Sequence, residues 1–331
     1  MKKSTSPLPP SGTRNSSKRK KYHVLIGISF IITGAVLFLI LTNFLFAYHP
    51  PHATIRATQP QWLEYNPRIE TMIAQVNESE LYRTTSELQN FSTRKYPSPE
   101  NNQASHYLYG RLVNMSGLHV EYQGAGVQNI IATIPGREES PDVTFIIGAH
   151  YDSISDDGND APGATDNGCG AAIVLELARV MNQHDFNHTI QFSFWNSEEI
   201  DHKGSREYVT YARENSLDIP LYYNVDSSCY DPDNQYVLDI MSDEQSKPIA
   251  ELMTRYNSLY GINFNLTYNR HDCTGDQSSF RDGGYPVIMT HSQSHGPAHT
   301  PFDSIDKVSP GYAKKNAQLA LSVLSAIAEV Q

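Results

Sequence analysis

The hydrophobic and polar residues of the chain follow two alternating patterns. Short apolar or alternating runs bounded by turn-forming residues predict strands, and they occur over 130–134, 143–149, 190–194, 221–225 and 286–290. Apolar residues three or four positions apart predict helices, and this spacing occurs over 67–76, 80–90, 99–115, 168–181, 204–214, 246–260 and 309–330. The alternation of strands with helices predicts an α/β fold, a three-layer sandwich with a central mixed, largely parallel sheet and helices on both faces.

The N-terminal part of the chain has a different composition. Residues 1–22 are rich in Ser, Pro, Lys and Arg, so we expect a disordered tail. No residue from Val24 to Ala47 is charged, and about 24 residues at 1.5 Å each exceed the roughly 30 Å core of a bilayer. We therefore predict a transmembrane helix over 23–47, a stalk over 48–65 and one globular domain over 66–331.

The flanks of the predicted span indicate its orientation. A basic run, Lys18-Arg19-Lys20-Lys21, lies just before it and predicts that the N-terminus stays in the cytoplasm. The span is then a signal anchor, and the globular domain lies outside the cytoplasm, in a periplasm or in a lumenal or extracellular space. A cleaved export signal is the alternative, although the apolar run is longer than the usual h-region of roughly 7–15 residues. Both interpretations place the domain in the same compartment.

The net charge of −11 is unevenly distributed. Residues 1–23 carry seven Lys or Arg and no Asp or Glu, which leaves 18 basic against 36 acidic residues in the remainder. Such an acidic body repels phosphate backbones, so nucleic acid is excluded as a partner. It tolerates cationic substrates, for example peptides with a free amine.

Three cysteines, Cys169, Cys229 and Cys273, are too few for a disulfide framework. The sequence allows a single bridge, between Cys229 and Cys273, or three free thiols.

Side chains that can bind metals lie at or just beyond the predicted strand ends. They are His150 and Asp152, Glu198 and Glu199, Asp226, His299, and Asp166 just before the helix that starts near 168. Each residue alone is more typical of a turn or a solvated surface, so the inference depends on the combination. Ligands of open α/β sheets bind at the carboxyl ends of the strands. A His, Asp and Glu set without Cys at that edge suits a catalytic zinc pair with open positions.

Five segments, taken in order, resemble one known family. They are Gly148–Ser153, Pro162–Gly168, Phe194–Glu199, Asn224–Asp226 and His299–Asp303. They are similar to zinc aminopeptidases of the bacterial leucyl aminopeptidase and aminopeptidase Y type, which share a superfamily with glutamate carboxypeptidases and glutaminyl cyclases. The resemblance covers about residues 100–330 and leaves out the tail, the span and the stalk. It implies a di-zinc metallopeptidase that removes N-terminal residues from peptide substrates.

The resemblance also implies a role for each residue. Asp166 would bridge two zinc ions, with His150 and Asp226 completing one site and Glu199 and His299 the other. Glu198 would be the general base that takes a proton from the attacking water. Asp152 would orient His150. A cis peptide bond between Asp166 and Asn167 is implied as well.

Some positions depart from the family pattern. Residues 200–203 stand where the family usually has small or apolar residues, Ser227 replaces a common Met, and Gln277 replaces a His. Cys169 stands where Ser or Ala is usual, and we interpret it as a small packing residue. We interpret the remaining histidines nearby, His291, His295, His202 and His271, as polar loop or solvent-facing residues, with His202 close enough to Glu199 to affect access. Candidates for pocket contacts, or alternatively for loop packing, are Arg270, Asp272 and Phe280.

Several other functions stay open. A carboxypeptidase or dipeptidase of the same superfamily is the nearest alternative. A glutaminyl cyclase uses one zinc and fewer ligands, so the full ligand set argues against it. A catalytically inactive binding ectodomain is a third alternative, and the presence of Glu198 argues against it.

Overall fold

The structure is a computed structural model, and it describes residues 62, 64–137, 143–268 and 274–331. The predicted tail, the predicted span over 23–47 and most of the predicted stalk lie outside these residues. In the part of the chain that is described, no helix is both long enough and apolar enough to cross a membrane.

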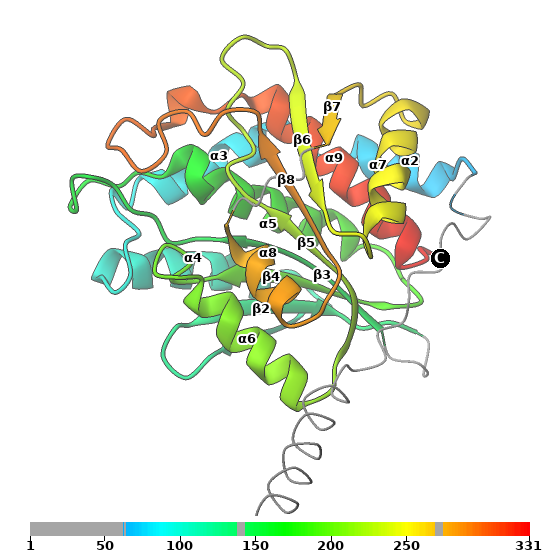
Figure 1. The fold of residues 1–331 in the computed structure, drawn as a ribbon, viewed down its shortest axis with the longest axis horizontal. Coiled ribbons are helices and arrows are strands. Elements are labelled where there is room, and N and C mark those ends of the chain that lie inside the picture. Colours follow the sequence, from blue (N-terminus) through cyan, green and yellow to red (C-terminus); the bar gives the residue numbers. More distant parts are fainter. Residues whose placement is uncertain (1–61, 63, 138–142, 269–273) are drawn as a thin grey trace, which may run out of the picture. The chain divides into compact units, whose positions relative to one another are not determined.

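The centre of the domain is an eight-stranded mixed sheet (Figure 1). Its strands run in the order β1-β2-β4-β3-β5-β8-β6-β7. The central strands β4, β3, β5 and β8 are mutually parallel, whereas β2 and β6 join them in antiparallel pairings. The predicted mixed sheet is therefore confirmed, and its parallel centre is the part that carries the strand ends discussed above. The bounds are β1 His119–Gln123, β2 Asn129–Ile134, β3 Val143–His150, β4 Thr189–Trp195, β5 Asp218–Val225, β6 Val237–Ser242, β7 Asn265–Tyr268 and β8 Val287–Ser292.

Most helices begin at polar caps or at Pro, as the sequence pattern suggests. The side chain of Asn66 accepts a hydrogen bond from the backbone N–H of Arg68, and Ser98 accepts one from Asn101, each satisfying an N–H that the first helical turn leaves free. The bounds are α2 Pro67–Ala74, α3 Glu78–Gln89, α4 Pro99–Val113, α5 Cys169–Met181, α6 Lys203–Glu214, α7 Lys247–Leu259, α8 Asp276–Asp282 and α9 Pro310–Ile327.

The two faces of the sheet are buried in separate cores. On β3, Phe145 and Ile147 belong to the core that includes residues of α3, α5 and α9, whereas Ile146 belongs to the core that includes residues of α6 and α8. This alternation follows from the two-residue period of a strand. The predicted three-layer arrangement is thus present in the structure.

The sheet positions the candidate site through its strand ends. His150 is the last residue of β3, Asp226 directly follows β5, and Glu198 and Glu199 lie just past β4. Because these three strands are parallel neighbours, their carboxyl ends meet at one edge.

Candidate metal centre

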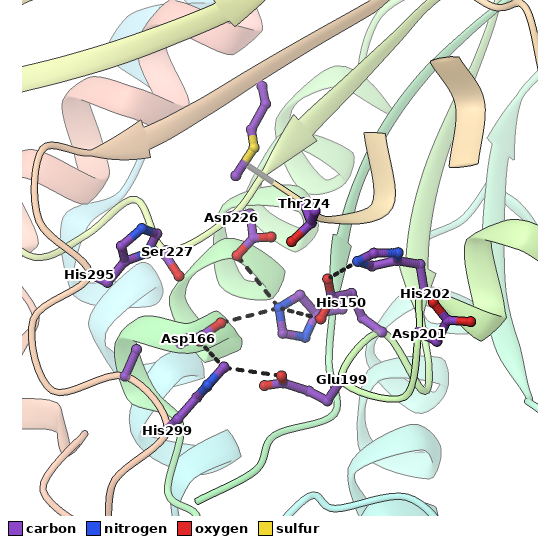
Figure 2. Close-up of a pocket in the computed structure, with 13 residues that line it drawn as sticks. His150, Asp166, Glu199, Asp201, His202, Asp226, Ser227, Thr274, His295 and His299 are labelled. Atoms are coloured by element: carbon purple, nitrogen blue, oxygen red, sulfur yellow. Dashed lines mark ion pairs between the residues drawn. The ribbon is translucent and has the colours of Figure 1, made fainter. Parts of the chain in front are cut away.

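The six residues to which the resemblance assigns a ligand or base role line one pocket of about 570 Å³ (Figure 2). They are His150, Asp166, Glu198, Glu199, Asp226 and His299. All but His299 are at least partly buried at the base of the pocket, and the His299 side chain is 53% exposed. Asp152, the remaining predicted site residue, is buried behind His150.

The carboxylate of Asp166 lies between the two histidines. Its Oδ1 is 3.2 Å from His150 Nε2, and its Oδ2 is 3.1 Å from His299 Nε2. Each histidine has a second carboxylate neighbour: Asp226 Oδ1 lies 3.5 Å from His150 Nε2, and Glu199 Oε2 lies 3.1 Å from His299 Nε2. The donor atoms therefore form two sets of three that share Asp166.

These residues fit a metal ion by two independent observations. His150, Asp166 and Glu199 each offer a donor atom, and these atoms all lie within 4.8 Å of one another. The other oxygen of Glu199, Oε1, is buried and has no hydrogen-bond partner within the described part of the chain. A buried oxygen of this kind is costly unless a further group satisfies it. The set of imidazole and carboxylate donors suits zinc.

The charges of these buried carboxylates and histidines also favour a bound cation. Burial raises the pKa of Glu198 well above its ordinary value and that of Glu199 to about 7. Burial acts in the same direction on Asp166, but hydrogen bonds with His150 and His299 outweigh it and hold its pKa below the ordinary value. The pKa of His299 rises to about 11 through its hydrogen bonds to Asp166 and Glu199. Metal ions among these atoms would supply the same positive charge and leave both imidazoles neutral, as ligation requires.

Asp152 connects three functional residues. His150 Nδ1 lies 3.2 Å from the backbone carbonyl oxygen of Asp152 and 3.5 Å from its carboxylate, both on the side of the ring away from Asp166. The two carboxylate oxygens of Asp152 also accept hydrogen bonds from the backbone N–H groups of Glu198 and Glu199, at 3.1 and 3.2 Å. Asp152 therefore fixes the imidazole of His150 and the backbone of Glu198 and Glu199 at the same time, a wider role than the sequence indicated.

The turn that carries Asp166 is held by a residue to which sequence reasoning assigned no role. Asp303 accepts hydrogen bonds from the backbone N–H groups of Thr165 and Asp166 and from the Thr165 hydroxyl, at 2.7–3.0 Å. The Asp166–Asn167 peptide bond is cis, as the resemblance implied. Asp303 belongs to the quoted segment His299–Asp303, so that segment contained the only sequence signal for it.

Arg94 is a second residue that sequence reasoning missed. It is fully buried, and its guanidinium donates to the backbone carbonyls of Tyr151, Pro162 and Gly163 at 2.6–2.8 Å. These carbonyls belong to the two segments that carry His150 and Asp166. A lone Arg in a polar stretch gives no signal in the sequence, because its acceptors are backbone atoms brought together by the fold.

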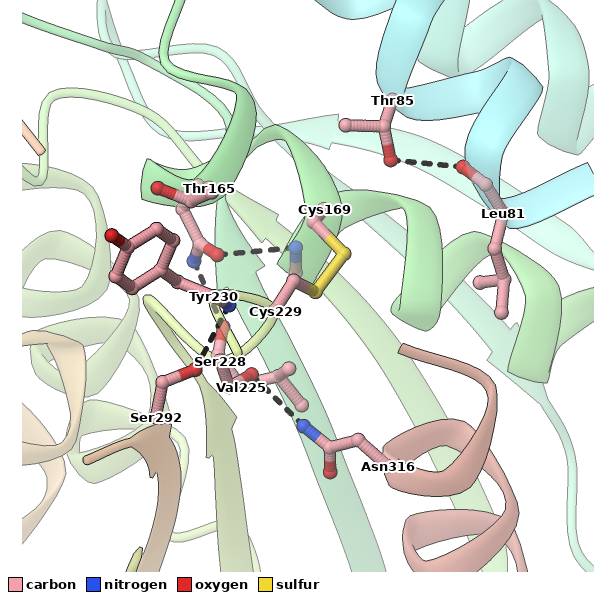
Figure 3. Close-up of a disulfide and its surroundings, with 12 residues drawn as sticks. Leu81, Thr85, Thr165, Cys169, Val225, Ser228, Cys229, Tyr230, Ser292 and Asn316 are labelled. Carbon is pink, nitrogen blue, oxygen red and sulfur yellow. Dashed lines mark hydrogen bonds between the residues drawn. A yellow bond between two sulfur atoms is a disulfide. The ribbon is translucent and has the colours of Figure 1, made fainter. Parts of the chain in front are cut away.

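A disulfide joins two of the segments that carry candidate ligands (Figure 3). It links Cys169, at the start of α5, to Cys229, three residues beyond Asp226, and both cysteines are fully buried. The predicted bridge between Cys229 and Cys273 is therefore wrong, as are the interpretations of three free thiols and of Cys169 as a mere packing residue. Cys273 lies outside the described residues. The error arose because the pairing depends on the adjacency of β5 and α5, which sequence spacing does not reveal.

The pocket differs from expectation at several of the departing positions. Gln277 does not line it, because its Oε1 accepts a hydrogen bond from the buried side chain of Asn224. Phe280 packs against Tyr222 in the core under α6 and α8, whereas Arg270 and Asp272 lie outside the described residues. His295 is an exposed loop residue, as predicted, although it also lines the pocket. The predictions for the other two are wrong: His202 is largely buried and lines the pocket, and His291 is buried on β8. His271 lies outside the described residues.

Comparisons with known proteins point to one family. The sequence pattern of peptidase family M28 matches residues 129–324, more than half of the chain, and this region contains all five candidate ligands and Glu198. Leucine aminopeptidase 1 of Aspergillus niger is 27% identical over 315 residues, which cover 86% of this chain and 79% of that protein. The LapA aminopeptidase of Legionella pneumophila has a similar fold, with a TM-score of 0.72 at 19% identity over 80% of this chain and 76% of that chain. BSAP, a zinc aminopeptidase from Bacillus subtilis, matches with a TM-score of 0.53 at 25% identity over 60% of this chain and 50% of that chain.

Proposed function

This chain belongs to peptidase family M28, and on that premise we propose that it is a di-zinc aminopeptidase with Glu198 as its general base. Its place in this family and its similarity to leucine aminopeptidases identify the chain as a zinc metallopeptidase that acts as an aminopeptidase. The number of zinc ions, the ligand of each and the catalytic roles are the proposal. The observation that carries it is the Asp166 carboxylate between His150 and His299.

Two zinc sites follow from the two sets of donors. His150, Asp166 and Asp226 would hold one ion. Asp166, Glu199 and His299 would hold the other. When bound, zinc supplies Lewis acidity that polarises a scissile carbonyl and lowers the pKa of water.

The side chains around the ligands perform the remaining steps. Glu198 lies beside the donor atoms, with its Oε2 3.9 Å from His150 Nε2, and belongs to neither set of three. It can accept a proton from the attacking water and return it to the leaving amine. Asp152 fixes the backbone of Glu198 and holds its carboxylate near the pocket.

We infer the preference for free N-termini from the acidic character of the domain and from the aminopeptidase relatives. A domain with this excess of acidic residues favours a cationic amine over a carboxylate. Glutaminyl cyclases also share this fold, with TM-scores of 0.64 and 0.65, but at 18% and 19% identity the likeness concerns the fold alone. A glutaminyl cyclase and a carboxypeptidase are therefore outcomes of the test below.

The test uses the full chain purified in detergent. Leucine p-nitroanilide, its N-acetylated form and an N-terminal glutaminyl peptide are compared with and without a chelator. We expect hydrolysis of the free-amine substrate, none of the acetylated one, loss of activity with chelator, its return with zinc, and about two zinc ions per chain. Ammonia release from the glutaminyl peptide without hydrolysis, or a clean value of one zinc, would indicate a cyclase instead.

We also propose that residues 23–47 anchor the protein in a membrane and that the peptidase domain lies outside the cytoplasm. The uncharged run and the basic residues before it support this topology. The Cys169–Cys229 bridge supports it independently, since disulfides persist mainly in oxidising compartments. The full-length protein is expected in the membrane fraction after lysis and to resist extraction by alkaline carbonate. Complete recovery in the supernatant without cleavage would refute the anchor.

A further inference from the structure

The loop between Glu199 and α6 places an additional imidazole at the edge of the site. This is the segment 200–203, where the resembling family usually has small or apolar residues. Asp201 and His202 both have left-handed backbone conformations, with φ of 61° and 51°. The turn they form directs the side chain of His202 back toward the pocket, which it lines (Figure 2).

The backbone of His202 is fixed on both sides. Its N–H donates to the carbonyl of Glu198 at 2.8 Å, and its own carbonyl accepts a hydrogen bond from the N–H of Arg206 at 3.0 Å. The hydroxyl of Ser205 donates to the same carbonyl at 3.2 Å. The backbone that carries the imidazole is therefore held by Glu198 and by the start of α6.

The side chain of His202 contacts one carboxylate oxygen of Glu198. Its Nε2 lies 3.4 Å from Glu198 Oε1, while the other oxygen, Oε2, faces His150 at 3.9 Å. The His202 side chain is only 18% exposed. The two histidines thus lie on opposite oxygens of the same carboxylate.

The chemistry of this contact favours donation by His202. Burial lowers its pKa, so the ring is neutral near pH 7 and can carry its single N–H on Nε2. The nearby carboxylate of Asp201 acts in the opposite direction on the pKa of His202, but burial outweighs it, and Asp201 is itself paired with Arg206 at 2.8 Å.

We propose that His202 is a positioning residue for Glu198: it holds Oε1 and so keeps Oε2 turned toward the reacting atoms. This inference depends on the proposed function, because it gives Glu198 the role of general base. Holding one oxygen restricts rotation of the carboxylate, so the base meets the water in one orientation. Misplacement of a catalytic group by about 1 Å can cost on the order of 100-fold in rate.

The experiment compares His202→Leu and His202→Gln with the wild type on leucine p-nitroanilide. Leu removes the donor at similar volume, whereas Gln places an amide N–H near the position of Nε2. Arg213→Gln is the matched control, since it alters an exposed residue in the last turn of the same helix α6, outside the pocket. For each variant kcat, KM, zinc content and the melting temperature are measured on the full chain in detergent.

We expect His202→Leu to lower kcat by about 10-fold to 100-fold, with KM, zinc content and melting temperature close to those of the wild type. His202→Gln should recover most of the loss, and Arg213→Gln should match the wild type. In a Glu198→Gln background the His202→Leu change should cost nothing further, because both act through one carboxylate.

Other results would overturn the inference. They are an unchanged kcat in His202→Leu, loss of zinc from that variant, failure of His202→Gln to recover activity, or a full additional loss in the Glu198→Gln background. With each of these results the wild type still hydrolyses the substrate, so the result would refute the role of His202 without refuting the proposed function. An inactive wild type that contains zinc would instead overturn the proposed function, and the role of His202 with it.

Discussion

The disulfide between Cys169 and Cys229 gives the sharpest prediction about the integrity of the site. The two cysteines are 60 residues apart in sequence, and the closed loop includes β4, α6 and β5. In the chain-entropy account, a cross-link over a loop of this length stabilises the folded state by about 4 kcal/mol. We therefore expect the double variant Cys169→Ala/Cys229→Ala to lose about that much free energy of unfolding. For a domain of this size the loss corresponds to a melting temperature lower by roughly 8–16 °C.

The measurement is equilibrium unfolding of the full chain in detergent with excess zinc, so that metal binding contributes equally to both proteins. Cys273→Ala is the control and should leave the melting temperature within about 2 °C. Peptide mapping without reductant should recover the Cys169 peptide linked to the Cys229 peptide. A stability loss below about 1 kcal/mol, or a mapped link from Cys229 to Cys273, would refute this reasoning.

Other consequences of the structure can be tested with single substitutions. Glu198→Gln should retain zinc and lose activity by about 10²-fold to 10⁴-fold, because only the proton acceptor is removed; a variant with wild-type turnover would exclude Glu198 as the base. Asp152→Asn should weaken zinc binding about 10-fold to 100-fold in a competition titration with a chelator, since the amide replaces one of the two oxygens that accept from the backbone N–H groups of Glu198 and Glu199. An unchanged affinity would contradict its supporting role. Arg94→Met should lower the free energy of unfolding by about 3 kcal/mol or more, because it leaves buried carbonyls without donors. The control Arg83→Met breaks a half-exposed ion pair with Glu80 and should cost less than about 1 kcal/mol. Equal effects of the two substitutions would argue against the buried role of Arg94.

The parts of the fold that could be predicted are those with a strong apolar period. The strand β3 and the helix α5 are buried almost throughout, so their apolar residues could be recognised in the sequence. Three missed elements lack this signal: β1 and β7 are mostly exposed edge strands, and α8 is a seven-residue helix of largely polar sequence. The strand β6 was missed as well, although four of its six residues are buried, because Asp239 interrupts its short apolar run. The positions of β1, β6 and β7 depend on their neighbours in the sheet more than on their own residues.

The same distinction applies to the site. The candidate ligands could be found because each lies at or just beyond a recognisable strand or at the start of a recognisable helix, and because their order resembles one family. Arg94, Asp303 and the Cys169–Cys229 pair could not be assigned their roles, because each acts on backbone or side-chain atoms from a distant segment. His202 lies between these cases, since the departure at 200–203 was visible while its contact with Glu198 was not.

Some of the residues that hold the site in place lie outside the region that matches the family. The match begins at residue 129, yet Arg94 holds the carbonyls next to His150 and before Asp166. Asn101, also outside the match, exchanges two side-chain hydrogen bonds with Asn196, just ahead of Glu198, at 2.9 and 3.0 Å. Both residues are buried, so their removal would leave polar atoms of the ligand-bearing segments unsatisfied. The segment from α3 to α4 therefore belongs to the same structural unit as the candidate ligands, and a fragment that starts at residue 129 would carry every candidate ligand but lack Arg94 and Asn101, which hold the ligand-bearing segments.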